Sequence, residues 1–401
     1  MILADVPRKS AVGDTGKVLS RQGGRTRIAF VGCGFVADLY ARTLALHPQL
    51  ELSGVFDRDP QRSDVFARHF ATKRYRALGE LLDDDCVEIV VNLTNPRSHF
   101  EVSTACLEAG KHVYSEKPLA MDMSEARWLT ELAEERGLLL SGAPCSVLGE
   151  TAQTVWRALR KNVVGRVRLV YAELDDGLLH RMAYRKWFSG SGTPWPYKNE
   201  FQTGCTLEHA GYYLTWLAAF FGPVERLVAF SSVQVPDKDR DVPPASMGPD
   251  FSVACMRFDS GVTARLTCSV VAPHDHSLRI VGDQGVLCMR DCWHYRSPVW
   301  VYRRIALRRK TFLLPWRRRL PLAGRELRRT PSWGAAQMDW CRGIAEMVDA
   351  IRQNRPNRLS AAYCLHMTEL ALAIHSAGIA GCSRTLATSF EPMEPMSWAK
   401  S

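Results

Sequence analysis

A glycine-rich turn near the N-terminus constrains the fold of this chain more than any other feature of its sequence. The turn has the pattern G-x-G-x-x-A and consists of Gly32, Cys33, Gly34, Phe35, Val36 and Ala37. A short apolar run precedes it, and an apolar helical periodicity that reaches about Leu46 follows it. A strand, a tight glycine turn and a helix in this order are typical of a dinucleotide-binding Rossmann unit. We therefore assign all of these residues except Cys33 to cofactor binding.

Each position of the turn has a physical reason. Gly32 allows the tight turn, Gly34 lets the backbone approach a pyrophosphate at the helix N-terminus, and Ala37 lets the helix pack close to the sheet. Asp57 ends the next predicted strand, 20 positions after Ala37, where a carboxylate can accept hydrogen bonds from both ribose hydroxyls. This carboxylate favours NAD. The neighbouring Arg58 could receive a 2′-phosphate, so NADP remains an alternative.

The pattern of predicted elements divides the chain into two parts. Residues 26–141 alternate between strand and helix patterns, which predicts a parallel sheet covered by helices on both faces. Beyond residue 145, strand patterns at hairpin-like spacings dominate, at 167–173, 251–258, 262–270 and 278–281. Helix patterns at 336–352 and 359–378 follow. The predicted fold is α/β, with an N-terminal Rossmann domain and a C-terminal α+β domain that has a largely antiparallel sheet.

The predicted boundaries follow from these patterns and from composition. We expect a disordered leader at 1–24, a Rossmann domain at 25–145, a substrate and oligomerisation domain at 146–385, and a tail at 386–401. No apolar run approaches the roughly 18 residues that span a bilayer, and we expect no secretory signal. The 12 cysteines are scattered without a zinc-binding spacing. These features predict a cytoplasmic protein with reduced thiols.

The positive charge of the chain is concentrated in one segment. The net charge is +10, from 52 Lys and Arg against 42 Asp and Glu, and residues 302–330 hold eleven of the cations and one of the acids. This basic insertion surrounds an aromatic and aliphatic stretch, which favours a contact with an anionic membrane surface or a phosphate ligand. The alternatives are a solvated insertion or an oligomer contact. No nucleic-acid-binding motif accompanies the segment, so we expect no nucleic acid partner.

Four short motifs together resemble one known family. Ser115-Glu116-Lys117-Pro118 follows what we take as the fifth strand of the Rossmann domain, and Thr94-Asn95-Pro96-Arg97-Ser98-His99 follows the fourth. The motifs at 163–167 and 282–285 stand at turns in the second half. The sequence from about residue 26 to 378 resembles the glucose–fructose oxidoreductase, inositol dehydrogenase and MocA family (Gfo/Idh/MocA), closely in the first half and loosely in the second.

The resemblance implies a function. It implies a cytoplasmic NAD(P)-dependent enzyme that transfers hydride between nicotinamide and a hydroxyl or carbonyl group of a sugar, nucleotide sugar or cyclitol. It also implies a homo-oligomer, a dimer or tetramer formed through the second-domain sheet. The residues that match the family's cofactor loops are Thr94, Asn95, Pro96, His99, Glu116 and Lys117.

The expected catalytic residues are Lys117, His209 and Tyr213. Lys117 follows a strand at the carboxyl edge of the parallel sheet, where its ammonium could stabilise charge on a substrate oxygen. Family members usually have G-G-x-L-x-D-x-G-x-H, but here His209 stands at the Asp position and Tyr213 at the His position. An α-helix would place these two on one face and turn Glu208 about 100° away. His209 or Tyr213 would then accept the proton, unless both only pack or bind substrate.

Other interpretations stay open at this stage. An NAD-dependent hydrolase or lyase that works through transient oxidation, and a non-catalytic NAD-binding sensor, are both compatible with the altered motif. His274-Asp275-His276 has a spacing that invites a metal interpretation. Because no further ligand is evident from the sequence, we expect a strand-end loop with solvated side chains and no metal.

Overall fold

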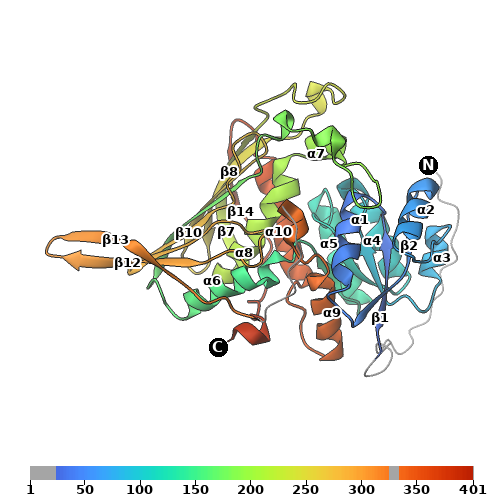
Figure 1. Ribbon diagram of the computed structural model, residues 1–401, viewed down its shortest axis with the longest axis horizontal. Helices are drawn as coiled ribbons and strands as arrows, with labels where there is room; N and C mark the ends of the chain where they lie inside the picture. The colour runs from blue at the N-terminus through green and yellow to red at the C-terminus, as the bar shows by residue number, and fades with distance from the viewer. Residues whose placement is uncertain (1–23, 325–333, 401) are drawn as a thin grey trace.

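The computed structural model describes residues 24–324 and 334–400, and its architecture is set by two sheets (Figure 1). The first, sheet A, has five parallel strands in the order β2-β1-β3-β4-β5. Its strands are β1 (Thr26–Val31), β2 (Leu50–Phe56), β3 (Ile89–Asn92), β4 (His112–Ser115) and β5 (Leu140–Gly142). The expected parallel sheet of a Rossmann domain is confirmed. The expected leader, 1–24, lies outside the described residues except for residue 24.

Helices connect the strands of sheet A and cover it. They are α1 (Phe35–Leu44), α2 (Pro60–His69), α3 (Leu78–Leu82), α4 (His99–Glu108) and α5 (Met123–Glu135). Asp122 caps α5, because its carboxylate accepts a hydrogen bond from the Ser124 amide. The predicted numbering of the strands before the 94–99 and 115–118 motifs was wrong by one, because β3 and β4 are the third and fourth strands of the chain and not the fourth and fifth. Between β2 and β3 the chain forms a single bridge, from Arg74 to Val55, in place of a further strand.

Sheet B fills the second half of the chain with nine strands in the order β13-β12-β11-β10-β6-β9-β8-β7-β14. Only β6 and β9 pair in parallel, so the expected largely antiparallel sheet is confirmed. Its strands are β6 (Val167–Asp175), β7 (Val224–Ser232), β8 (Phe251–Phe258), β9 (Thr263–Ser269), β10 (Leu278–Gly282), β11 (Gly285–Met289), β12 (Trp300–Leu307), β13 (Lys310–Arg319) and β14 (Cys382–Thr385). The four predicted strands of this half correspond to β6, β8, β9 and β10.

Helices separate the two sheets. They are α6 (Glu150–Arg160), α7 (Tyr197–Thr203), α8 (Gly211–Phe221), α9 (Arg342–Arg352) and α10 (Ala361–His375), with a π-helical turn, η5 (Thr206–Ala210), in front of α8. Short 3-10 turns lie at η1 (Pro96–Ser98), η2 (Ser146–Leu148), η3 (Leu179–Arg181), η4 (Tyr184–Lys186), η6 (Pro244–Ser246), η7 (Gly334–Gln337) and η8 (Ser397–Ala399). None of the helices within the described ranges is long and apolar enough to cross a membrane.

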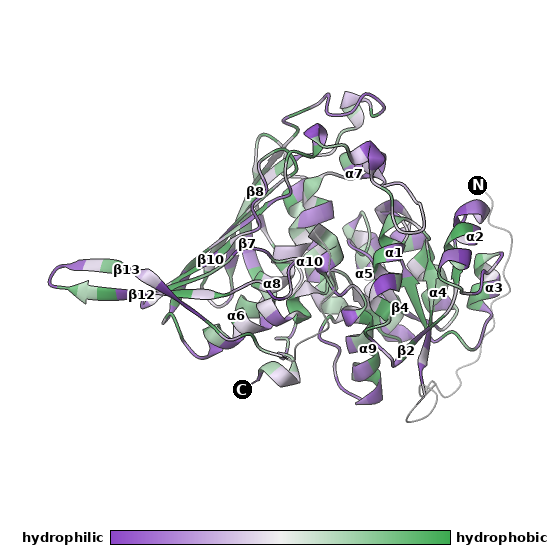
Figure 2. Ribbon diagram, viewed as in Figure 1, coloured by the Kyte–Doolittle hydropathy of each residue, from purple (hydrophilic) through white to green (hydrophobic). Residues whose placement is uncertain are grey.

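The central helix α10 joins the two halves. It packs against α5 and β5 of the Rossmann half and against β7 and β8 of sheet B. Helices that are apolar on nearly every side are buried, and ten of the 15 residues of α10 are buried. One continuous hydrophobic core therefore runs through both halves. Figure 2 shows strongly hydrophobic residues along the strands of sheet A at one end of this core.

Most of the described part of the basic segment forms a two-stranded ribbon, whereas residues 325–330 of that segment lie outside the described residues. Strands β12 and β13, residues 300–319, extend beyond the rest of the molecule at its far end (Figure 1). We call these residues the cationic ribbon, because they include eight Lys and Arg and no acid. Nearly every residue of β13 is exposed. Charged and apolar segments alternate along the ribbon (Figure 2).

A buried arginine holds an acid of the second half that contacts the Rossmann half. Arg342, at the start of α9, donates to Asp339 through Nε at 3.0 Å and to Glu150 through Nη1 at 3.0 Å. Asp339 also lies 2.9 Å from Nε2 of His47, which follows α1 in the Rossmann half. The Arg342 and Asp339 side chains are less than a tenth exposed. Their charges are therefore satisfied by one another rather than by water.

We predict that Arg342→Ala lowers the free energy of unfolding by about 3–5 kcal/mol, because it leaves the buried Glu150 carboxylate without its cation and Asp339 with His47 alone. Chemical denaturation followed by circular dichroism measures this change. Arg168→Ala is the matched control, because Arg168 pairs with Asp283 at the surface. The control should unfold almost as the unchanged protein does. Equal stability of both variants would contradict the role given to Arg342.

Candidate functional site

The glycine turn after β1 forms an open cradle at the N-terminus of α1. Gly32 has φ +99°, and a Cβ there would lie 2.6 Å from the Leu93 carbonyl oxygen, so only glycine fits. Gly34 is the N-cap of α1 and makes no side-chain cap, and a Cβ there would meet no protein atom within 4 Å. Free backbone N–H groups therefore face open space, which fits a pyrophosphate. Phe35 and Val36 are half-buried in the first turn, and Ala37 is fully buried.

Asp57 lies beside this cradle with its carboxylate held in place. Its Oδ2 accepts a hydrogen bond from the Cys33 amide and its Oδ1 accepts one from the Asp59 amide, both at 2.8 Å. Arg58 is exposed, and Nη1 of Arg62 lies 3.7 Å from Asp57 Oδ2. Arg62 was not predicted as a cofactor residue, because it lies one helical turn beyond Arg58.

His99, which was expected to contact the cofactor, links two loops at the edge of the sheet through its ring nitrogens. Its side chain is fully buried, and its ring nitrogens lie 2.6 Å from the Pro118 carbonyl and 3.0 Å from the Thr94 carbonyl. It therefore ties the loop after β3 to the loop after β4. Asn95 and Pro96 are half-buried at the same edge of the sheet. They remain predicted cofactor contacts.

Glu116 fixes the loop that carries the lysine. Its Oε1 accepts a hydrogen bond from the Tyr40 hydroxyl at 2.7 Å, and its Oε2 accepts one from the Lys117 amide at 3.2 Å. Tyr40 is fully buried on α1, and Glu116 is 6% exposed. The carboxylate is thus occupied by the protein itself. It orients Lys117 relative to α1, and the N-terminus of α1 carries the cofactor cradle.

Lys117 meets an acid from the second half of the chain. Its Nζ lies 2.5 Å from Oε2 of Glu208 in the π-helical turn η5, and the two side chains are 18% and 10% exposed. Burial alone would lower the pKa of Lys117, but the carboxylates of Glu208, Glu116 and Glu200 together outweigh it and raise the pKa above its usual value. The expectation that Glu208 points away was wrong. It assumed α-helical geometry, whereas a π-helical turn changes the direction of each side chain.

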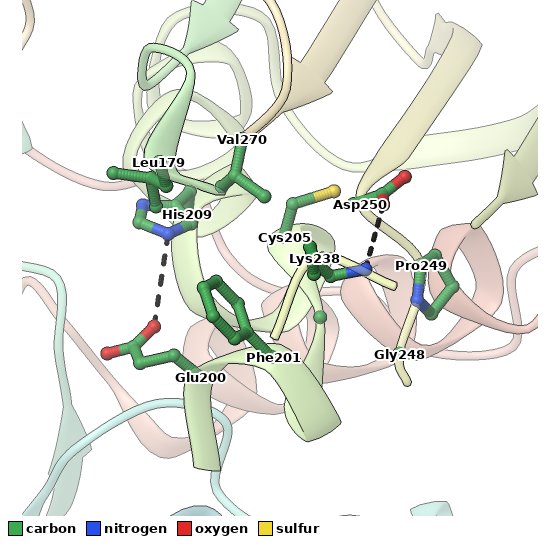
Figure 3. A pocket seen from close by; sticks show the side chains of 11 residues that line it. Leu179, Glu200, Phe201, Cys205, His209, Lys238, Gly248, Pro249, Asp250 and Val270 are labelled. Carbon is green, nitrogen blue, oxygen red and sulfur yellow. Dashed lines mark hydrogen bonds and ion pairs between the residues drawn. The ribbon is translucent and has the colours of Figure 1, made fainter. Parts of the chain in front are cut away.

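His209 lines a neighbouring pocket together with Glu200 and Phe201 (Figure 3). Its Nε2 lies 4.0 Å from Glu200, and its Nδ1 lies 3.6 Å from Asp176. Burial lowers the pKa of His209, while the Asp176 carboxylate opposes that change. Burial and the nearby Glu208 raise the pKa of Glu200 well above its usual value. Lys117, Glu208, Glu200 and His209 thus form one connected group of titratable side chains.

Tyr213 does not join this group. Its side chain is fully buried, and its hydroxyl donates to the His276 carbonyl and contacts Met289 Sδ at 3.4 Å. The hydroxyl therefore faces the strands of sheet B. His209 and Tyr213 therefore do not form the pair that the sequence predicted, because their side chains contact different parts of the structure. We do not retain Tyr213 as a proton carrier.

Three acids of the site were missed by the sequence analysis. Glu208 was visible in the motif but was given the wrong direction. Glu200 stands on α7 and Asp176 follows β6, and neither belongs to a recognisable pattern. They reach the site only because distant segments fold together.

The comparisons with known proteins are consistent with this geometry. The model of the oxidoreductase family with an NAD-binding Rossmann fold matches residues 26–143. The model of the GFO/IDH/MocA C-terminal domain matches residues 152–288. The chain belongs to the Gfo/Idh/MocA family. It is thus an NAD-binding oxidoreductase with dehydrogenases and reductases among its relatives.

Individual relatives are distant. Trans-1,2-dihydrobenzene-1,2-diol dehydrogenase of Bos taurus is 26% identical over 273 residues, which are 67% of this chain and 75% of the relative. D-apiose dehydrogenase of Paraburkholderia graminis is 26% identical over 248 residues, 61% of this chain and 60% of the relative. The crystal structure of a 3-ketoreductase from Actinomadura kijaniata, in complex with NADP and TDP-benzene, has a TM-score of 0.67 at 22% identity. It covers 88% of this chain and 98% of that one, and it shares the fold.

We predict that Gly34→Ala weakens NAD(P) binding about tenfold or more, because the added methyl group occupies the space into which the pyrophosphate must come. The same variant should fold normally, since the methyl group meets no protein atom and φ at Gly34 is −75°. Fluorescence titration measures the binding, and thermal unfolding checks the fold. Gly79→Ala is the control: its methyl group also meets open space, but on α3. Unchanged affinity in Gly34→Ala would contradict the cradle.

Proposed function

We propose that this protein is an NAD(P)-dependent dehydrogenase or reductase that acts on a CH–OH group of a sugar, nucleotide sugar or cyclitol. The observation that carries the proposal is the contact of Lys117 with Glu208 at 2.5 Å. It places an ammonium at the carboxyl edge of the Rossmann sheet, where ligands of such folds bind. The names of the relatives support the substrate class, because dihydrodiol, apiose and UDP-N-acetylglucosamine all carry hydroxyl-bearing carbons.

The residues of the chain divide the chemistry among them. The nicotinamide supplies the acceptor for the hydride that leaves the alcohol carbon. Lys117 holds the alcohol oxygen and stabilises the negative charge that develops on it. The proton of the hydroxyl passes to the Lys117–Glu208 pair, and the carbon–oxygen bond becomes a carbonyl. In the reverse direction the same pair returns the proton to the oxygen.

The choice between the two cofactors depends on the groups at the end of β2. The Asp57 carboxylate favours the free ribose hydroxyls of NAD, because it repels a 2′-phosphate. Arg58 and Arg62 offer two guanidinium groups that could receive that phosphate instead. We propose NAD as the preferred cofactor, with NADP as the alternative. Comparison of the two dissociation constants decides between them.

Three variants test the proposed chemistry once a substrate has been found by a thermal-shift screen of sugars, nucleotide sugars and cyclitols with NAD present. We predict that Lys117→Ala loses about 10²–10³-fold in turnover at unchanged NAD affinity, because its partner is the substrate oxygen. Glu208→Gln should lose about 10²–10⁴-fold if Glu208 receives the proton. Absorbance of the reduced nicotinamide measures each rate.

His209→Asn separates the earlier hypothesis from this one. If His209 accepts the proton, this variant loses turnover and Glu208→Gln retains it. If the Lys117–Glu208 pair accepts the proton, Glu208→Gln loses turnover and His209→Asn retains it. Full turnover in Lys117→Ala would contradict the proposed reaction itself.

We also propose that the cationic ribbon contacts an anionic lipid surface. Its tip carries Arg308, Arg309 and Lys310, and Trp316 is 70% exposed beside three further arginines. Exposed apolar side chains amid cations suit the boundary between lipid headgroups and acyl chains. The predicted homo-oligomer and the predicted domain boundaries remain predictions.

Vesicle sedimentation tests the ribbon. We predict that the protein sediments with vesicles that contain phosphatidylserine at low salt. It should stay in the supernatant at high salt or with vesicles of phosphatidylcholine alone. Replacement of the three tip cations with Gln should weaken binding about a hundredfold, at ~1 kcal/mol for each cation near the surface. Trp316→Ser should also weaken it, whereas Trp128→Ser, on α5, should not. Equal recovery on all vesicles would contradict the proposal.

A further inference from the structure

Three potential metal ligands lie close together near His209. Asp176 follows β6, and His274 and His276 lie in the loop before β10. Asp176 Oδ1 lies 3.5 Å from His276 Nε2 and 4.0 Å from His274 Nδ1. One ligand atom from each of the three residues lies within 4.8 Å of the others.

The backbone holds these residues together. Asp175 and Asp275 form an antiparallel bridge, in which each amide donates to the carbonyl of the other residue at 2.9 Å. Successive side chains in extended segments point to opposite faces. The neighbours of the bridged pair therefore share the other face: Asp176 on one segment, His274 and His276 on the other. The cluster is a consequence of the strand pairing rather than of flexible surface side chains.

His276 has the environment of a metal ligand. Its side chain is fully buried, yet its Nε2 has no hydrogen-bond partner among the residues that the structure describes. Its Nδ1 lies 3.4 Å from Oδ1 of Asp291, and the Trp293 amide donates to that same oxygen at 2.9 Å. A carboxylate that receives the second ring nitrogen is the usual outer partner of a metal-binding histidine.

We propose that Asp176, His274 and His276 bind a divalent first-row transition-metal ion, with zinc as the best match. Two imidazoles and one carboxylate suit zinc and its neighbours, whereas Mg²⁺ and Ca²⁺ prefer oxygen ligands alone. Bonds of about 2.0–2.2 Å in a tetrahedral site bring ligand atoms to roughly 3.3 Å apart. The ion would draw the cluster slightly together, which is easy for His274 because its side chain is 56% exposed.

The position of this site relates it to the pocket. His209 Nδ1 lies 3.6 Å from the second carboxylate oxygen of Asp176. Three protein ligands leave a fourth position for water or a substrate oxygen, as in catalytic zinc sites. The binding of the ion itself does not depend on the proposed dehydrogenase activity, so failure of one leaves the other standing.

A metal-free arrangement is the rival explanation. Burial alone would lower the pKa of His276, but Asp176 and Asp291 outweigh it and raise the pKa to about 9. The same three side chains could therefore form an ion-paired cluster around a protonated imidazole. A direct measurement of metal binding separates the two arrangements.

The test uses the untagged full-length protein after dialysis against a chelator. Calorimetric titration with Zn²⁺ should give one ion per chain, and Co²⁺ should give visible d–d absorption at the same stoichiometry. His274→Ala and Asp176→Asn should abolish this binding. Asp291→Asn should weaken it about 10–100-fold, because Asp291 only orients His276. His69→Ala, at the exposed end of α2, should leave it unchanged.

Thermal unfolding and NAD binding confirm that each variant is folded, and His274→Ala is the variant that perturbs the core least. Absence of Zn²⁺ binding by the unchanged protein would overturn the proposal in favour of the ion-paired cluster. Retention of binding in His274→Ala would also overturn it. So would loss of binding in Cys292→Ser with retention in His274→Ala, because the ion would then belong to the second group, His276, Asp291 and Cys292.

Discussion

The ammonium of Lys117 is held in a largely buried position at the edge of the Rossmann sheet, and much of the site depends on how that charge is compensated. An unpaired charge away from water is strongly unfavourable, so an acid has to reach it. Glu208 supplies the acid from the other half of the chain, at 2.5 Å. The π-helical turn at η5 makes this contact geometrically available. This ion pair therefore links the backbone conformation of η5, in the second half, to the position of Lys117 in the first half.

Such a contact requires that the two halves keep a fixed relation to each other. The apolar helix α10 lies between them, and Asp339, which Arg342 holds in place, contacts His47 of the Rossmann half. Buried ion pairs are weak sources of net stability but strongly disfavour any arrangement that separates the partners. The continuous core supplies the stability and the buried charges specify the register. Together they keep Lys117 opposite η5.

The polar side chains of the site around Lys117 come from segments that are far apart in the sequence. Glu200 comes from α7, Asp176 from the end of β6, and His276 from the loop before β10. Burial disfavours the charged form of both groups, so it raises the pKa of Glu200 and lowers that of His209. Asp176 also supplies the carboxylate that completes the proposed metal site.

The sequence by itself determined the elements whose causes are local. The strand, glycine turn and helix around Gly32 and Gly34, the acid Asp57, and the position of Lys117 after a strand all follow from short-range sterics and periodicity. The tertiary structure alone decided which side chains face one another. It turned Glu208 toward Lys117 through a π-helical turn, buried Tyr213 against sheet B, and brought Asp176 to a pair of histidines about a hundred residues away. These contacts depend on strand pairing and helix phase across long separations, which no local pattern encodes.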